Sequence, residues 1–192
     1  DVDDDVIFQH GYVLKELPVN FNIVNGNFEC FDVLLETLKG SPKKVYGSFD
    51  VSSNKLESLK FFPEYIEQDV YLYNNNIQDL RYLSKNISGR VSLNRNNIRT
   101  LKHLSGLSFI IKNNPVELLW NLFRDKNQIE YFNELDIITP DEKSIIFDRL
   151  NYFLTDIGKN EVEILSKEKS YFQCLIRFIP DKFYIKDYNI IY

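Results

Sequence analysis

Apolar residues recur along this chain with a period of 21 residues, and each recurrence carries the same short pattern of apolar and polar positions. Four columns of the pattern are apolar and a fifth holds asparagine, except that Val33 takes the asparagine position in the first unit. Such a period, shortened only before the last unit, predicts a repeat architecture of about five units in register. The aligned positions are Phe28, Phe49, Val70, Val91 and Phe109; Cys30, Val51, Leu72, Leu93 and Ile111; Asn54, Asn75, Asn96 and Asn114; Leu35, Leu56, Ile77, Ile98 and Val116; and Leu38, Leu59, Leu80, Leu101 and Leu119.

Each unit is interpreted as one coil of a solenoid. Alternating apolar positions, such as Phe49 and Val51, predict a short strand with those side chains pointing inward. The asparagine that follows is expected to turn the chain and to hydrogen-bond backbone groups that the turn leaves unpaired. One coil cannot bury its apolar side chains alone, whereas stacked coils bury them continuously. Cys30 falls in an apolar column, so it is predicted to be a core residue and not a nucleophile.

The repeat resembles the leucine-rich-repeat pattern L-x-x-L-x-L-x-x-N-x-L. The opening stretch Leu17-Pro18-x-x-Phe21-x-x-Val24-x-Gly26 is similar to leucine-rich-repeat proteins of large tailed bacteriophages and related viruses, and the likeness covers roughly residues 11–165. The chain departs from that pattern at Val33, at Gln68 in place of a glycine, and in its long tail. The resemblance implies an α/β repeat fold with parallel strands on a concave face, a helical C-terminal cap and a binding role.

Four segments are expected along the chain. Residues 1–16 are expected to form a leader with a frayed acidic start, whose residues 6–8 and 12–14 cover the first coil. Residues 17–119 carry the solenoid, and 120–165 a helical cap. Within that cap, Thr139 is expected to begin a helix with Pro140, Asp141 and Glu142 in its first turn. The apolar stripe of this helix is expected at Ile145, Ile146, Leu150, Phe153, Leu154 and Ile157.

Residues 166–192 form an aromatic tail. Two extended segments on either side of Pro180-Asp181 predict either a small β-hairpin packed on the cap, or a segment that docks on a partner or on a second copy of the chain. The candidate contact residues of the tail are its aromatic side chains. They are Tyr171, Phe172, Phe178, Phe183, Tyr184 and Tyr188.

Composition narrows the functional classes. The 192 residues are 44% apolar and 15% aromatic, which is too apolar for a disordered chain. A net charge of -5 argues against a nucleic-acid partner. No apolar run approaches the roughly 20 residues of a membrane span, and a cysteine count of 2 fits a reducing compartment such as the cytoplasm.

The chain shows no catalytic pattern. His10 and His103 are far apart, and the motifs of nucleotide, zinc and nucleophile sites are absent from the sequence. The acidic start lacks the spaced ligands of a cation loop. We therefore expect neither a cofactor nor a metal, and a protein that is not an enzyme.

Polar and aromatic positions beside the predicted strands form the candidate binding surface. Five strands about 4.8 Å apart and about 17 Å long offer only roughly 300–350 Å², whereas a stable interface uses about 800 Å² per partner. The tail, the cap or a second copy would have to add area. Solvated strand positions with strand-favouring tyrosines are an equally good interpretation. The candidate residues are Glu29, Phe31, Asp50, Asp69, Tyr71, Tyr73, Arg90, Asn94 and Arg95.

Two hypotheses follow. The leading one is a non-enzymatic protein–protein interaction module, encoded by a phage or another virus, that binds a host or viral protein. One form of it is inhibition of a host enzyme or defence factor, which rests on the family resemblance. The alternative is a structural or assembly subunit of a larger particle, whose tail inserts into a neighbour.

Overall fold

The computed structural model of this chain has two compact units. The first comprises Asp1–Ile98 and Lys102–Glu117, and the second comprises Arg99–Leu101 and Leu118–Tyr192. The structure describes residues 1–8, 11–104, 106–117, 120, 125–139, 144–157, 162–164, 174–177, 182–185 and 189–191.

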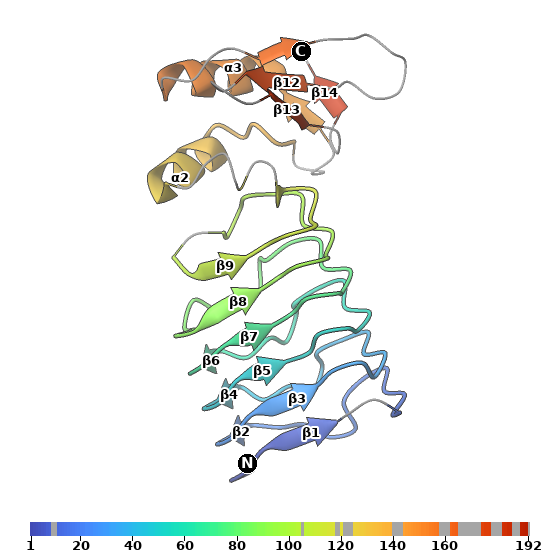
Figure 1. Ribbon diagram of the computed structural model, residues 1–192. Coiled ribbons are helices and arrows are strands. Elements are labelled where there is room, and N and C mark those ends of the chain that lie inside the picture. The colour runs from blue at the N-terminus through green and yellow to red at the C-terminus, as the bar shows by residue number, and fades with distance from the viewer. Residues whose placement is uncertain are drawn as a thin grey trace. The chain divides into compact units, whose positions relative to one another are not determined.

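Within the described residues of the first unit, six short strands lie side by side in one parallel sheet (Figure 1). Phe28 pairs with Phe49, which pairs in turn with Val70. The register advances by 21 residues from β3 to β5, β7 and β8, by 22 into β3 and by 18 into β9, so the prediction of stacked parallel coils with a period of about 21 is confirmed. The strands, in sheet order, are β1 (Val6–Phe8), β3 (Phe28–Cys30), β5 (Phe49–Asp50), β7 (Val70–Tyr71), β8 (Arg90–Ser92) and β9 (Ser108–Ile110).

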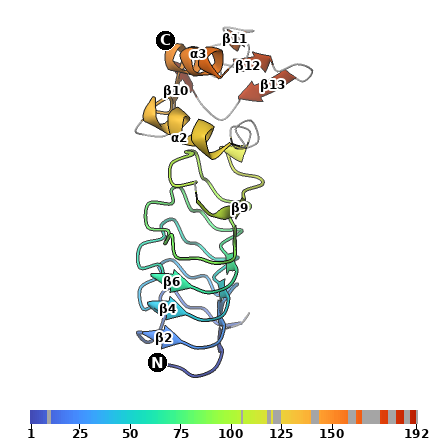
Figure 2. The same ribbon diagram turned by 90° about the vertical axis from the view of Figure 1, so that its left-hand side faces the viewer.

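A second, smaller parallel sheet runs through the same coils. Its strands β2 (Ile23–Val24), β4 (Lys44–Val45) and β6 (Tyr65–Ile66) are stacked on one another (Figure 2). An isolated bridge between Ile66 and Ile87 continues the stack. The sequence shows the period of these segments, but two-residue strands do not alternate long enough to be predicted. The first unit is therefore a β-solenoid of about five turns with two sheets.

The apolar columns form the core of the solenoid. Phe28 and Phe49 are stacked with ring centroids 5.4 Å apart, and Phe62 meets Phe49 edge-on at 5.4 Å. Cys30 is fully buried, as predicted, and burial, together with the nearby Asp50 carboxylate, raises the pKa of its thiol to about 12. A thiol held in this protonated form is a structural residue.

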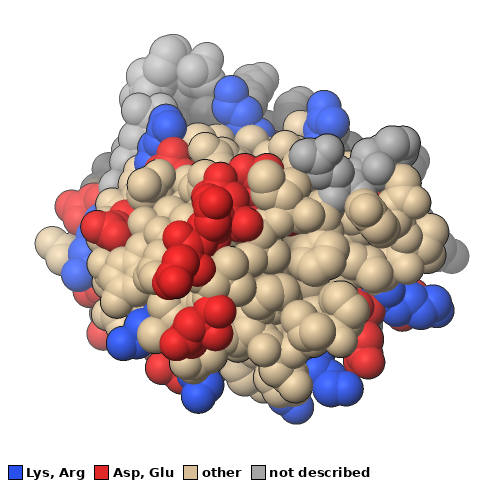
Figure 3. All heavy atoms as spheres, turned by 90° about the horizontal axis from the view of Figure 1, so that it is seen from below, with Lys and Arg blue, Asp and Glu red and all other residues tan. Residues whose placement is uncertain are grey.

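The first eight residues are ordered parts of the solenoid, and the expectation of a frayed start is wrong. Asp1 and Asp3 accept hydrogen bonds from the side chains of Asn22 and Asn25, at 2.8 and 2.9 Å. β1 pairs with β3 in the same parallel sense as the later coils. Residues 6–8 thus cover the edge of the first coil, as expected. In the second covering segment the Leu14 N–H donates to Val33 O of that coil at 2.8 Å, whereas Tyr12 and Val13 are exposed. Acidic side chains form a band on the end of the solenoid that carries β1 (Figure 3).

The second unit contains two described helices. Helix α2 (Lys126–Glu134) begins at Asp125, whose carboxylate accepts the backbone N–H of Asn127 at 2.8 Å. Helix α3 (Phe147–Asp156) buries Phe153, and this ring meets Phe132 of α2 edge-on at 5.4 Å. Packing between these two helices therefore supplies part of the core of this unit.

Helix α3 begins later than predicted. Residues Ser144–Ile146 form strand β10, and Ile145 bridges Ile138 in the antiparallel sense. The Thr139 hydroxyl accepts the backbone N–H of Ser144 in β10 at 3.0 Å, and it does not cap helix α3, whose N-cap is Ile146. A tertiary pairing here overrides the helix-start signal at Thr139. Pro140, Asp141 and Glu142 lie outside the described residues.

Strands of the tail pair within the second unit. β12 and β13 pair antiparallel, with Arg177 opposite Lys182, on either side of Pro180-Asp181. β14 pairs with β10 in the parallel sense. Phe183 and Tyr184 lie in β13, whereas Tyr171, Phe172, Phe178 and Tyr188 lie outside the described residues. The strands are β11 (Val162–Ile164), β12 (Cys174–Arg177), β13 (Lys182–Ile185) and β14 (Asn189–Ile191).

Candidate interaction surface

The outward face of the six-stranded sheet carries the side chains that the sequence singles out. Phe28 and Cys30 point into the core while Glu29, between them, points outward and is half-buried, as strand alternation requires. The sheet face is defined here by nine side chains. Glu29, Phe31, Asp50, Asp69, Tyr71 and Asn94 are half-buried, and Tyr73, Arg90 and Arg95 are exposed.

Three of the predicted residues form one interacting group. The Asp69 carboxylate accepts the Arg90 backbone N–H at 2.8 Å and lies 3.3 Å from the Arg90 guanidinium. The Tyr71 hydroxyl donates to the same carboxylate at 3.4 Å. The backbone hydrogen bond from Arg90 and its nearby charge lower the pKa of Asp69, while partial burial and the Asp69 charge raise the pKa of Tyr71. Asp69 is thus ionised at neutral pH and fixes the position of both neighbours.

Asp69 also belongs to a series of side chains that connect successive coils. Asn27 accepts the backbone N–H of Ser48 at 2.9 Å, and Asp5 accepts that of Asn27 at 2.6 Å. To reach the backbone N–H on the next coil, each of these side-chain oxygens passes close to the glycine that precedes the N–H donor. A Cβ added at Gly89, for example, would lie 2.5 Å from Asp69 Oδ1. Only glycine leaves room for this bond, which explains the glycine column of the repeat.

Gln68 occupies the glycine column, and its side chain is tolerated there because no side chain from the preceding coil has to pass over it. The side chain facing it from the preceding coil is Ser48, which is too short to cross the position. Ser48 instead lies 3.4 Å from the Gln68 side-chain oxygen. Where the side chain on one coil is long enough to bridge to the next coil, the facing position on that next coil is glycine. Where the side chain is as short as serine, the facing position holds a larger residue.

Comparing two substitutions at Asp69 separates the contribution of its hydrogen bond to Arg90 from the contribution of its charge. We expect Asp69→Ala to lower the free energy of unfolding at pH 7 by about 1–2 kcal/mol, because the Arg90 N–H loses its acceptor. Asp69→Asn should lose less, because an amide oxygen does the same task at Asn27. Urea unfolding measures both.

The pH dependence has a defined sign. The folded-state pKa of Asp69 is lowered, so its ionic stabilisation is present above the unfolded-state pKa of about 3.9 and disappears as pH falls through the folded value. The stability difference between wild type and Asp69→Asn should therefore shrink on acidification. A difference that grows toward low pH would contradict this assignment.

A ladder of buried asparagines marks the edge where the strands end. Asn75 donates to Val51 O at 3.0 Å and to Leu72 O at 3.2 Å, and its oxygen accepts the Leu56 N–H at 3.0 Å. Asn54, Asn96 and Asn114 bond in the same way. The predicted role of this column in satisfying backbone groups is confirmed. The bonds also reach the preceding coil, so the ladder ties coils together.

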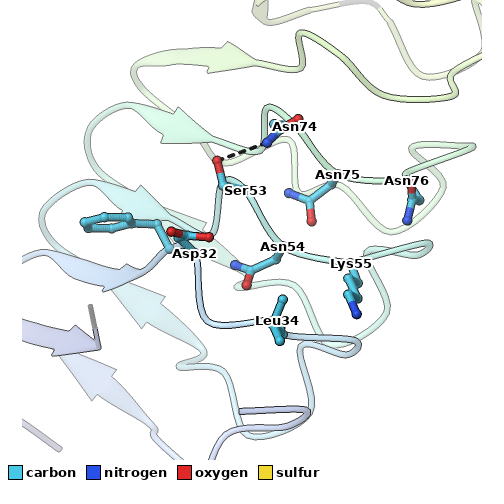
Figure 4. Close-up of a pocket in the computed structure, with 9 residues that line it drawn as sticks. Asp32, Leu34, Ser53, Asn54, Lys55, Asn74, Asn75 and Asn76 are labelled. Carbon is cyan, nitrogen blue, oxygen red and sulfur yellow. Dashed lines mark hydrogen bonds between the residues drawn. The ribbon is translucent and has the colours of Figure 1, made fainter. Parts of the chain in front are cut away.

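The residue before each ladder position has a left-handed backbone. Asp32, Ser53 and Asn74 have φ of 54°, 56° and 57°. This conformation turns the chain sharply out of the strand and leaves these side chains at the surface. The side-chain amide of Asn74 donates to the hydroxyl of Ser53, one coil earlier, at 3.3 Å (Figure 4).

An open depression of about 460 Å³ lies at this edge (Figure 4). Amides, a hydroxyl and a lysine line it together with two apolar side chains, Phe31 and Leu34. Leu34 is 38% exposed and has a φ of 68°, a conformation unfavourable for leucine. The lining residues are Phe31, Asp32, Leu34, Ser53, Asn54, Lys55, Asn74, Asn75 and Asn76.

Phe31 is one of the contact residues predicted from the sequence, whereas Leu34 is not among them. A signal existed, because Leu34 is the apolar member of a column whose next residues are Lys55 and Asn76. The depression is contiguous with the sheet face through Phe31 and extends the surface available to a partner. Its groups can offer hydrogen bonds and apolar contact.

The described residues contain no group of three or more His, Cys, Asp or Glu side chains placed to hold a metal ion. His103 has a lowered pKa, first because of its partial burial and then because of the Lys85 charge. Among the helices that the structure describes, none has the length and apolar character to span a bilayer.

The sheet face and the depression are thus built from residues that stabilise the solenoid and present amide, carboxylate, guanidinium and aromatic groups at its surface. Comparisons of the chain with protein-family models, with curated proteins and with solved structures found no match.

Proposed function

We propose that this protein is a non-enzymatic interaction module that binds a partner protein through the sheet face and the adjoining depression. The observation that carries the proposal is the exposed Tyr73, which lies beside Tyr71 on the sheet and close in sequence to the depression-lining Asn74. Tyrosine and arginine are the residue types that dominate binding energy at interfaces. The Asp69 group holds Tyr71 and Arg90 in place, which lowers the entropy lost on binding.

Charge changes sign along the stack of coils. Glu29 and Asp50 lie on the earlier strands, and Arg90 and Arg95 on or beside the later one. A partner with basic groups facing the first coils and acidic groups facing the last would be oriented by this arrangement. The surface therefore favours one docking direction over its reverse.

We further propose that the chain is a viral leucine-rich-repeat protein whose partner is a host or viral protein, and inhibition of a host factor is one form of this activity. The period, the asparagine ladder and the parallel strands are consistent with a leucine-rich repeat, and the viral origin rests on the sequence resemblance alone. The alternative, an assembly subunit with an inserting tail, has less support, because β12, β13 and β14 pair inside the second unit.

Affinity capture with the full chain as bait tests the interaction. We compare wild type with a variant carrying Leu34→Gly, Tyr71→Ala and Tyr73→Ala, in lysate of the cells in which the gene is expressed. Glycine suits the left-handed backbone at position 34, so the variant should fold. We expect one protein to be held in stoichiometric amount by wild type and at least tenfold more weakly by the variant. Equal binding by both would contradict the proposal. Tyr82→Ala, at an exposed tyrosine that belongs neither to the sheet face nor to the depression, serves as a control.

A further inference from the structure

Phe61 stands out as an apolar residue in an unfavourable position. Its side chain is 51% exposed and its backbone φ is 72°. The same turn of the preceding coil is occupied by Gly40 with a φ of 91°, the residue that this conformation favours. An exposed phenylalanine with a left-handed backbone lowers stability, so the fold itself does not require it.

Two of the non-glycine residues with a left-handed backbone differ from the others in side-chain type. Among the described non-glycine residues with positive φ, Leu34 and Phe61 are apolar and the others are Asp, Asn, Ser, Arg or His. Leu34 lines the depression already described, and Phe61 lines another one. Strained residues cluster at binding sites because binding, and not stability, keeps them there.

The aromatic groove is the depression beside Phe61, with a volume of about 410 Å³. Its other aromatic walls are anchored: Phe21 meets Phe28 edge-on at 5.4 Å, and Phe62 meets Phe49 at 5.4 Å. Phe61 is the exposed wall. The lining residues are Asn20, Phe21, Gly40, Ser41, Pro42, Lys43, Phe61, Phe62 and Glu64.

A hydroxyl in the groove lacks a partner. The Ser41 Oγ is shielded from solvent and makes no hydrogen bond within the described residues. A buried hydroxyl of this kind costs free energy until an acceptor or donor reaches it. A carbonyl or carboxylate oxygen entering the groove would supply an acceptor.

The charge around the groove is positive, in contrast to the net charge of -5 of the chain. Lys43 lines the groove, and the Lys60 ammonium lies 5.1 Å from the centroid of the Phe61 ring. Lys43 and Lys60 are exposed, and in the described structure no carboxylate forms an ion pair with them. Glu64 is the acidic residue among those that line the groove. The excess of positive charge favours an anionic ligand.

We propose that the aromatic groove binds an extended acidic segment of a partner protein, with an apolar side chain placed between Phe21 and Phe61 and carboxylates directed toward Lys43 and Lys60. Aromatic-lined grooves recognise extended segments in this way. This site is separate from the sheet face, and the proposal does not depend on the function proposed there.

A displayed library of random heptapeptides, selected on the full chain at low salt, tests this site. We expect enrichment of peptides in which an apolar residue is flanked by Asp or Glu. Their affinity, measured by fluorescence anisotropy with the synthetic peptides, should fall at least tenfold in Phe61→Gly and in Lys43→Glu with Lys60→Glu. It should remain unchanged in Tyr71→Ala with Tyr73→Ala, which separates this site from the sheet face.

Folding controls keep the test decisive. Phe61→Gly should melt at or above the wild-type temperature, because Gly40 has the same conformation one coil earlier. Phe61→Asn, which also tolerates a left-handed backbone, is the second variant. No enriched peptides, enriched peptides without acidic residues, or peptides that bind Phe61→Gly as well as wild type would each overturn the proposal.

Discussion

Replacing Asn75 by alanine should lower the free energy of unfolding by about 3 kcal/mol, one of the two largest effects expected for this chain. The Asn75 side chain is buried and bonds backbone groups of its own coil and of the preceding one. Alanine leaves the buried Leu56 N–H without its acceptor, and it removes one of the two amide donors to each of the Val51 and Leu72 carbonyls, which keep those of Asn54 and Asn96. Urea unfolding followed by circular dichroism measures the loss.

The adjacent residue supplies the matched control. Asn76 is exposed and its backbone N–H donates to Leu56 O, a bond that substitution of the side chain leaves intact. Asn76→Ala should therefore change stability by less than about 0.5 kcal/mol. Similar losses in the two variants would show that the ladder is not what ties the coils together.

The substitution Asn75→Asp gives a second check. The introduced carboxylate could still accept the Leu56 N–H, but it would face two carbonyl oxygens where the Asn75 amide donates. Protonation restores a donor, so the stability deficit of Asn75→Asp should decrease as the pH falls. A deficit independent of pH would contradict the donor role of Asn75.

Gly47→Ala should destabilise the solenoid by a similar amount, about 3 kcal/mol, at the upper end of the range for overpacking. A Cβ at Gly47 would lie 2.5 Å from Asn27 Oδ1 and 2.6 Å from Gly26 O. The coils would have to separate there, and the Asn27 bond to Ser48 would be lost. Thermal and urea unfolding both measure the effect.

Gln68 is the control for this prediction, because it occupies the same column one coil later. Gln68→Ala should be near neutral, since the position already holds a side chain. If the Asn27 side chain causes much of the clash, Asn27→Ser should recover part of the Gly47→Ala loss, with a coupling of about 1 kcal/mol in a double-mutant cycle. Additive effects would indicate that only backbone contact limits position 47.

The candidate surface was predictable in part. Strand alternation is a property of the chain alone, so it placed Tyr71 and Tyr73 beside the core columns and outside the core. The group formed by Asp69, Tyr71 and Arg90 needed the stacking of coils, because its members meet only when residues 21 positions apart become neighbours. Phe61 was missed because its importance lies in backbone conformation and exposure. Leu34 was missed because a single apolar residue in an otherwise polar column is a weak signal without them.

Local signals failed where a distant pairing competed with them. Thr139 followed by proline and acidic residues is a helix-start pattern, yet the pairing of Ile145 with Ile190 in β14 makes residues 144–146 a strand. The acidic start looked frayed by composition, yet its aspartates bond to asparagines one coil later. In both segments the decisive partner lies outside the local sequence window.

By itself the sequence determined the period, the four core columns and the asparagine column, because a repeated pattern exposes the same burial requirement in every coil. Only the tertiary structure decided the second sheet, the place of the first eight residues in the stack, and the grooves beside Leu34 and Phe61. The physical reason is that hydrophobic periodicity records what each residue must bury. Hydrogen bonds between coils, left-handed turns and surface depressions depend instead on which coils come to lie next to one another.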